Sequence, residues 1–159
     1  MISEVTRLKI DAFMRKALED IRLNAINIDT GQYFPKRLRE ELAAELSYEV
    51  TEDEFILRGK GYFYTLVTGR GPTVNPGPGA VRRYITEYLE EQGESGADLT
   101  RHAFNAATRQ HEYGSKLYRS GQQSEVVKSI INEQTIADLK QQVAQALVID
   151  VGKYIQESV

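Results

Sequence analysis

The spacing of apolar residues predicts two helices at the beginning of the chain. In residues 3–23, apolar side chains such as Ile10 and Met14 recur at the steps that place them on one face of a helix. Ser3 suits the N-cap of this helix. Leucines repeat the same pattern in residues 35–46, and a proline is tolerated in the first turn of a helix. We therefore expect two amphipathic helices joined by a turn.

The period changes from helical to alternating in the middle of the chain. Residues 48–50, 54–58 and 62–67 are short runs rich in aromatic and β-branched side chains, separated by Thr-Glu-Asp and Gly-Lys-Gly. Such runs between turn signals predict an antiparallel meander of three strands. The loop at 69–79 that follows holds three of the chain's 4 prolines and four of its 12 glycines. We expect this loop to project from the body.

Helical spacing returns after the loop. From residue 81, an amphipathic stripe predicts a helix that ends at Gly93. Residues 95–98 resemble a capping box with aspartate in place of glutamate, which predicts a further helix that ends at Gly114. The next ten residues, 114–123, have no helical stripe and are expected to form a loop.

The C-terminal part of the chain is expected to be helical as well. Residues 124–132 predict a weaker helix, and Thr135 suits the N-cap of a last helix that reaches about Glu157 with Leu139 on its apolar side. The pattern shows no internal repeat and no domain linker. The chain, residues 1–159, is therefore expected to form a single α+β domain: a small antiparallel sheet packed against several helices, with a long C-terminal helix.

Composition excludes several classes of protein. The 159 residues are enough to bury a core, and the absence of cysteine excludes disulfides and thiolate metal sites. The net charge is −3, so the chain lacks the excess of basic residues that is typical of a general nucleic-acid-binding domain. No apolar run approaches the length of a membrane span, and the N-terminus does not read as a signal peptide. We expect a protein that works inside the cell that synthesises it, without a membrane partner.

The sequence predicts neither a cofactor nor a metal. The loop at 69–79 lacks the lysine of a P-loop, and its glycines do not have the spacing of a dinucleotide-binding loop. Its prolines also remove backbone N–H groups that could hold a phosphate. The only two histidines, His102 and His111, fall on opposite sides of one predicted helix. They therefore cannot share a metal ion.

The tripeptide Asp29-Thr30-Gly31 leaves a catalytic alternative open. The same tripeptide surrounds the catalytic aspartate of retroviral-type aspartic proteases, in which two such carboxylates share a proton across a dimer. Those enzymes are almost wholly β, whereas this chain is mostly helical in pattern. The favoured interpretation is a structural turn, in which Gly31 has a positive φ and Asp29 or Thr30 binds backbone amides.

A second alternative, a small nucleic-acid-binding adaptor, depends on Arg82 and Arg83. These residues begin a predicted helix, where the helix dipole disfavours cations, so a phosphate could compensate them. The favoured interpretation is a solvated pair offset by Glu87, four residues after Arg83. Tyrosines at loop edges favour contact with another protein instead. They are Tyr33, Tyr62, Tyr64, Tyr113 and Tyr118.

The order of these motifs resembles one known family. IDTGQ at 28–32 precedes the leucine-striped KRLREEL helix, and YEVTEDEFILRGKGYFYTLVTGRGPT ends at Thr73. RHAFNAATRQHEYGSKLYRSG follows at 101–121. The arrangement is similar to that of the tail-completion, or neck, proteins of long-tailed bacteriophages. In that family an Asp-Thr-Gly turn precedes a short helix, and an aromatic strand runs into a glycine-containing loop. The likeness is clearest over residues 28–73 and 101–121.

This resemblance implies an α+β virion protein without catalytic activity. It implies a homo-oligomeric ring, which we expect to be a hexamer, assembled in the host cytoplasm at the head–tail junction. Its expected partners are other neck, tail-tube or head-completion proteins, with genome DNA passing non-specifically nearby in the channel. Arginine suits a subunit contact or a place at the channel wall, because its planar group can pair bidentately with a carboxylate or a phosphate. The expected contact residues are Arg70, Gly71, Pro72, Thr73, Pro76, Pro78, Tyr118 and Arg119.

Overall fold

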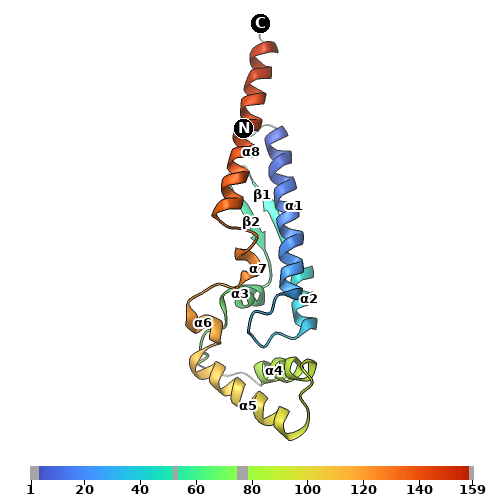
Figure 1. Cartoon of the computed structure of the whole chain (residues 1–159), viewed down its shortest axis with the longest axis vertical. Helices are drawn as coiled ribbons and strands as arrows, with labels where there is room; N and C mark the ends of the chain where they lie inside the picture. Colours follow the sequence, from blue (N-terminus) through green and yellow to red (C-terminus); the bar gives the residue numbers. More distant parts are fainter. Residues whose placement is uncertain (1–3, 52–53, 75–78, 158–159) are drawn as a thin grey trace.

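The chain folds as an elongated set of helices around one β-hairpin (Figure 1). The computed structural model describes residues 4–51, 54–74 and 79–157. Within them the α+β class is confirmed: helices dominate, and a small antiparallel sheet and a long C-terminal helix accompany them. The elements are α1 Glu4–Asn27, α2 Lys36–Ala44, β1 Ser47–Val50, β2 Phe55–Arg58, α3 Gly61–Thr68, α4 Ala80–Glu91, α5 Gly96–Tyr113, α6 Lys116–Ser120, α7 Glu125–Lys128 and α8 Glu133–Glu157.

The long helices α1 and α8 lie side by side and run in opposite directions (Figure 1). Their contact buries Ile10 and Met14 of α1 against Leu139 of α8. The hairpin packs on α1 through β1, and its two strands pair with Ser47 opposite Arg58. The helical period expected for both ends of the chain thus produces one antiparallel helix pair.

The largest buried cluster lies where α1, α2, α3 and α7 meet. Its four largest fully buried side chains each come from a different segment of the chain. They are Ile21, Leu46, Leu66 and Val126. Val126 belongs to the short helix α7, so even this one-turn element is fixed by a fully buried side chain.

Helices α4 and α5 form a hairpin with a separate core at the end of the molecule opposite the C-terminus (Figure 1). Aromatic rings join this hairpin to the rest of the chain. Tyr84 of α4 meets Tyr62 of α3 edge to face at 6.5 Å between ring centroids, and Tyr88 meets Tyr33 in the same way at 5.6 Å. Burial raises the pKa of the Tyr88 hydroxyl.

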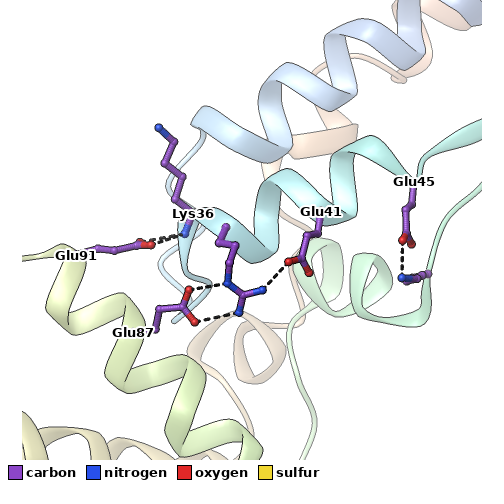
Figure 2. Close-up of polar contacts among 7 residues, drawn as sticks. Lys36, Glu41, Glu45, Glu87 and Glu91 are labelled. Atoms are coloured by element: carbon purple, nitrogen blue, oxygen red, sulfur yellow. Dashed lines mark hydrogen bonds and ion pairs between the residues drawn. The ribbon is translucent and has the colours of Figure 1, made fainter.

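Carboxylates of α4 also contact α2 (Figure 2). Both oxygens of Glu91 accept the backbone N–H of Lys36, at 2.9 and 3.0 Å. The residue before α2 is Pro35, which offers no capping side chain, so Glu91 supplies the N-terminal acceptor from a distant part of the chain. A second carboxylate of α4, Glu87, forms an ion pair with Arg37 of α2. The cap by Glu91 and this ion pair together attach the α4–α5 hairpin to α2.

The expected pairing of Arg83 with Glu87 is wrong. Glu87 accepts two hydrogen bonds from Arg37 of α2, at 3.1 and 3.2 Å, and Arg37 also pairs with Glu41 (Figure 2). Glu87, and to a lesser extent Glu41, raises the pKa of the Arg37 guanidinium. Arg82 and Arg83 are exposed, and neither forms an ion pair within the described part of the chain.

The third strand predicted at 62–67 is wrong, because these residues form helix α3. Phe63 and Leu66, three positions apart, are both buried, while Tyr62 and Tyr64 are exposed. This burial follows the helical period rather than alternation. Packing against α2 and α7 therefore overrides the β propensity of an aromatic and β-branched run. The other two strands are confirmed to within one residue at their ends.

Helix ends follow the predicted signals in part. Gly93 lies two residues beyond α4, and Gly114 directly follows α5. Ser95 occupies the N-cap of α5, although its side chain makes no capping hydrogen bond. Ser3, the predicted cap of the first helix, lies outside the described residues.

The last helix is capped differently from the prediction. α8 begins at Glu133, so Thr135 lies inside its first turn rather than at the N-cap. The side chain of Asn132 accepts the Thr135 N–H, and the Thr135 hydroxyl accepts the Asn132 N–H, both at 3.0 Å. This reciprocal pair is a capping box with Asn132 as the cap.

Candidate contact site at the glycine-rich loop

The described half of the glycine-rich loop lies against the body instead of projecting from it. The carbonyl of Arg70 accepts the Ser115 N–H at 2.7 Å, and the Arg70 N–H donates to the Ser115 hydroxyl at 3.0 Å. The Thr73 N–H donates to the carbonyl of His111 at the end of α5. Residues 69–73 are therefore fixed to the last turn of α5 and to the segment that joins α5 to α6. Pro76 and Pro78, two of the expected contact residues, lie outside the described residues.

Two glycines make this close packing possible. Gly69 has a φ of 86°, and a Cβ on it would lie 2.3 Å from the backbone nitrogen of Tyr118. Gly114 has a φ of 78°, and its Cβ would lie 2.8 Å from the carbonyl oxygen of Arg70. Both positions combine a backbone conformation that favours glycine with a lack of room for any side chain. The segments Gly-Arg-Gly and Gly-Ser-Lys-Leu-Tyr thus pack directly against each other.

The prediction of a loop at 114–123 is wrong in part, because these residues include helix α6. Buried Ser115 is the N-cap of α6, and its hydroxyl accepts the N–H groups of Arg70 and Tyr118. Gly121 ends the helix with a φ of 66°. One serine hydroxyl therefore positions both the loop and the short helix that carries Tyr118.

An open groove with an aromatic rim follows from this arrangement. Tyr64 of α3 is 71% exposed and Tyr118 of α6 is 49% exposed, and both line the groove. Thr68, Gly71 and Gln122 also line it. Among the expected contact residues, Arg70, Gly71 and Tyr118 come together here, and Arg119 lies exposed in the last turn of α6. Pro72 and Thr73 line a separate open groove beside the end of α5.

The side chain of Arg70 is half-buried, and it contacts Thr73 as well as a small cavity. Its guanidinium donates to the Thr73 hydroxyl at 3.1 Å, and it forms no ion pair with any described residue. The side chain also lines a small cavity of about 40 Å³ beside Gln32 and Gln110. The Gln32 amide nitrogen donates to the Leu66 carbonyl, whereas its oxygen has no hydrogen-bond partner among the described residues. Arg70 thus has a neutral hydrogen-bond acceptor and no carboxylate partner among the described residues.

Asp29, Thr30 and Gly31 form a tight turn between α1 and α2. The Gly31 N–H donates to the Asp29 carboxylate at 2.9 Å, and Gly31 has a φ of 64°. The Thr30 hydroxyl is 3.5 Å from the amide nitrogen of buried Gln32. The Asp29 carboxylate thus accepts a backbone amide of its own turn, as in an Asx turn.

The two histidines of α5 have different surroundings. His102 is exposed and its Nδ1 lies 3.0 Å from Glu94. His111 is half-buried beside Thr73, and its Nδ1 has no partner among the described residues. No group of three or more potential metal ligands occurs among the described residues.

Within the described residues, no helix is both long and apolar enough to cross a bilayer. Protein-family models, curated proteins and solved structures yield no match to this chain.

Sequence reasoning missed two features of the site. Ser115 was not singled out, although a serine followed by a short run that ends in glycine is a recognisable helix signal. Tyr64 was expected at a loop edge, whereas it lies on the exposed face of α3.

Proposed function

We propose that this chain is a non-catalytic structural subunit of the ring at the neck of a long-tailed phage, where it completes the tail and joins it to the head. The observation that supports this proposal is the packing of residues 69–73 against residues 114–118. These are two of the segments on which the resemblance to neck proteins depends. They lie 45 positions apart and yet build one surface, as parts of a single contact site would.

The chemistry of this surface favours a protein partner. Tyrosine and arginine are enriched in protein–protein interfaces, and here exposed Tyr64 and Tyr118 line a groove with a glycine in its wall. Exposed Arg119 follows Tyr118 in α6. The hydrogen bonds of Ser115 hold the loop in place before any partner arrives, which lowers the entropy cost of binding. In the proposed ring, the partner is the neighbouring subunit or the adjoining neck, tail-tube or head-completion protein.

Arg70 is proposed to meet a carboxylate of such a neighbour. The net charge of −3 favours this role over one organised around DNA. Glu87 and Glu91 already bind Arg37 and α2 within the chain, so Glu90, exposed on the same helix, is the better candidate on an identical neighbour.

The proposal is tested by complementing a phage that lacks this gene. Host cells supply the wild-type chain, Arg70→Glu or Arg119→Glu, and electron microscopy counts joined and separate heads and tails. Arg119 is exposed, so its variant tests the contact with little effect on the fold. Arg101→Glu, which reverses the charge at an exposed position on α5, is the matched control.

Both site variants should yield mostly separate heads and tails, while Arg101→Glu should assemble normally. Glu90→Arg should partly restore joining when it is combined with Arg70→Glu. Normal joining with both site variants would show that this surface is not the contact. Joined particles that have lost their DNA would instead place Arg70 at the channel wall.

A further inference from the structure

The α4–α5 hairpin joins the rest of the chain at one of its two ends. The chain enters the hairpin through Gly79 and leaves it through Gly114, and both glycines have a positive φ. Because α4 and α5 pack side by side as a hairpin, these two glycines lie at the same end, which we call the connected end (Figure 1). The turn at 92–95 lies at the opposite, free end.

Apolar packing on the rest of the chain comes from the first half of α4, close to the connected end. Val81 and Ile85 line a small cavity together with Leu38 of α2, and Tyr84 meets Tyr62 of α3 edge to face. The remaining apolar side chains of α4 and α5 are buried against one another. The hairpin therefore keeps a core of its own when it moves away from α2.

The second half of α4, toward the free end, is held mainly by polar contacts at the surface (Figure 2). Glu87 pairs with Arg37, and Glu91 accepts the backbone N–H of Lys36. We call these two contacts the latch. The ring of Tyr33 adds edge-to-face contacts. The side chains of Glu87 and Arg37 are 30% and 55% exposed, so water competes for their ion pair and the latch is weak.

The junction between the hairpin and the rest of the chain is incompletely packed. The cavity of about 40 Å³ lies there, lined by Gln32 and Leu38 on one side and by Val81 and Gln110 on the other. Gln32 is only 4% exposed, and its amide oxygen has no hydrogen-bond partner among the described residues. A buried acceptor without a partner destabilises the closed arrangement, and opening the junction gives it access to water.

We propose that the α4–α5 hairpin is a hinged lobe that turns as a rigid body about its connected end and is held closed against α2 by the latch. A hinge needs a few residues at the ends of elements that absorb the change in backbone angles. Gly79 meets this requirement, since a Cβ on it would meet no atom within 4 Å. The latch lies far from this pivot, so two weak contacts control the motion of the whole lobe. This inference is independent of the proposed neck function.

Amide hydrogen exchange of the full chain, followed by NMR, tests the hinge. The Lys36 N–H is a direct reporter, because the first residue of α2 has no acceptor in its own helix and Glu91 supplies one. Fully buried Ile21 of α1 reports on unfolding of the whole chain, and Ala106 of α5 reports on unfolding of the hairpin. In the parent chain, Lys36 should be less protected than both, because the lobe opens while the helices stay intact.

Two variants show whether the latch acts as one unit. Glu87→Ala removes the ion pair without touching the Lys36 N–H, and it should lower the protection of Lys36 about threefold because the closed lobe loses a contact. Glu41→Ala is the matched control, since Glu41 also pairs with Arg37 but belongs to α2 and keeps its partner when the lobe opens. It should leave the protection of Lys36 unchanged. Circular dichroism checks that both variants keep the helical content of the parent chain.

Four results would overturn the inference. Equal protection of Lys36 and Ile21 would show that the lobe opens only when the whole chain unfolds. An unchanged Lys36 in Glu87→Ala would show that the two latch contacts open separately. A loss in Glu41→Ala as large as that in Glu87→Ala would show that α2 itself frays. Protection of Ala106 no higher than that of Lys36 would show that the hairpin unfolds instead of turning. None of these depends on head–tail joining, so failure here is distinguishable from failure of the neck proposal.

Discussion

Replacing Gly69 with alanine tests whether the glycine-rich loop is packed as the structure describes. Gly69 has a φ of 86° and a ψ of 162°, a region that is essentially restricted to glycine. Forcing another residue into such a conformation costs about 1 to 3 kcal/mol. The added Cβ would also lie 2.3 Å from the Tyr118 nitrogen and 2.7 Å from the Ser115 hydroxyl oxygen. Backbone must therefore move, and the hydrogen bonds that join loop and α6 would break.

A glycine with open space around it serves as the control for a positive φ alone. Gly93 has a nearly identical φ of 89°, but a Cβ on it would meet no atom within 4 Å. Gly93→Ala should lower the free energy of unfolding by the conformational cost alone, about 1 kcal/mol. Gly69→Ala should lower it by about 3 kcal/mol or more, because overpacking adds about 1 to 3 kcal/mol.

Urea unfolding followed by circular dichroism measures both variants. The two unfolding midpoints should differ clearly at a common m-value. Equal losses of stability for Gly69→Ala and Gly93→Ala would refute the packing of the loop on α6, and with it the surface on which the proposed contact depends.

Three further predictions concern other contacts. Glu91→Ala should lower the free energy of unfolding by about 0.5 to 1 kcal/mol in urea, because the Lys36 N–H at the start of α2 loses its acceptor; an unchanged midpoint would contradict this cap. Asp29→Asn keeps the turn's acceptor, so assembly should survive and the parent chain should show no peptidase activity, whereas activity that the variant loses would support the protease alternative. The Tyr48 hydroxyl donates to Asp11 and holds the pKa of this carboxyl below its ordinary value, so Tyr48→Phe should destabilise the fold at pH 7. The part of the lost stability that depends on the charged carboxylate should disappear as the pH falls below about 3.9 and through the lowered pKa of Asp11. A loss of stability that stays constant or grows on acidification would contradict this role of Tyr48.

Local signals in the sequence predicted most of the helices. The stripe with Ile10 and Met14 is buried as the helical period requires, and Gly93 and Gly114 follow α4 and α5. These features depend on near neighbours in the chain, and the pattern of apolar positions records them directly. The β-hairpin was found for the same reason.

Features that depend on distant segments escaped prediction. Residues 62–67 have the composition of a strand, and only their packing against α2 and α7 makes them helical. Glu91 caps a helix that begins 55 residues earlier, and Glu87 binds Arg37 instead of the nearer Arg83. The junction of Gly69 with Tyr118 likewise forms only after both segments have folded.

The proposed neck function is tested most directly by imaging the assembled virion. Cryo-electron microscopy of purified particles should show the chain as a ring between head and tail, with residues 69–73 and helix α6 against a neighbouring subunit or an adjoining protein. Particles that lack the gene should separate into heads and tails. Joined, infectious particles without this protein, or density for it only outside the head–tail junction, would contradict the proposal.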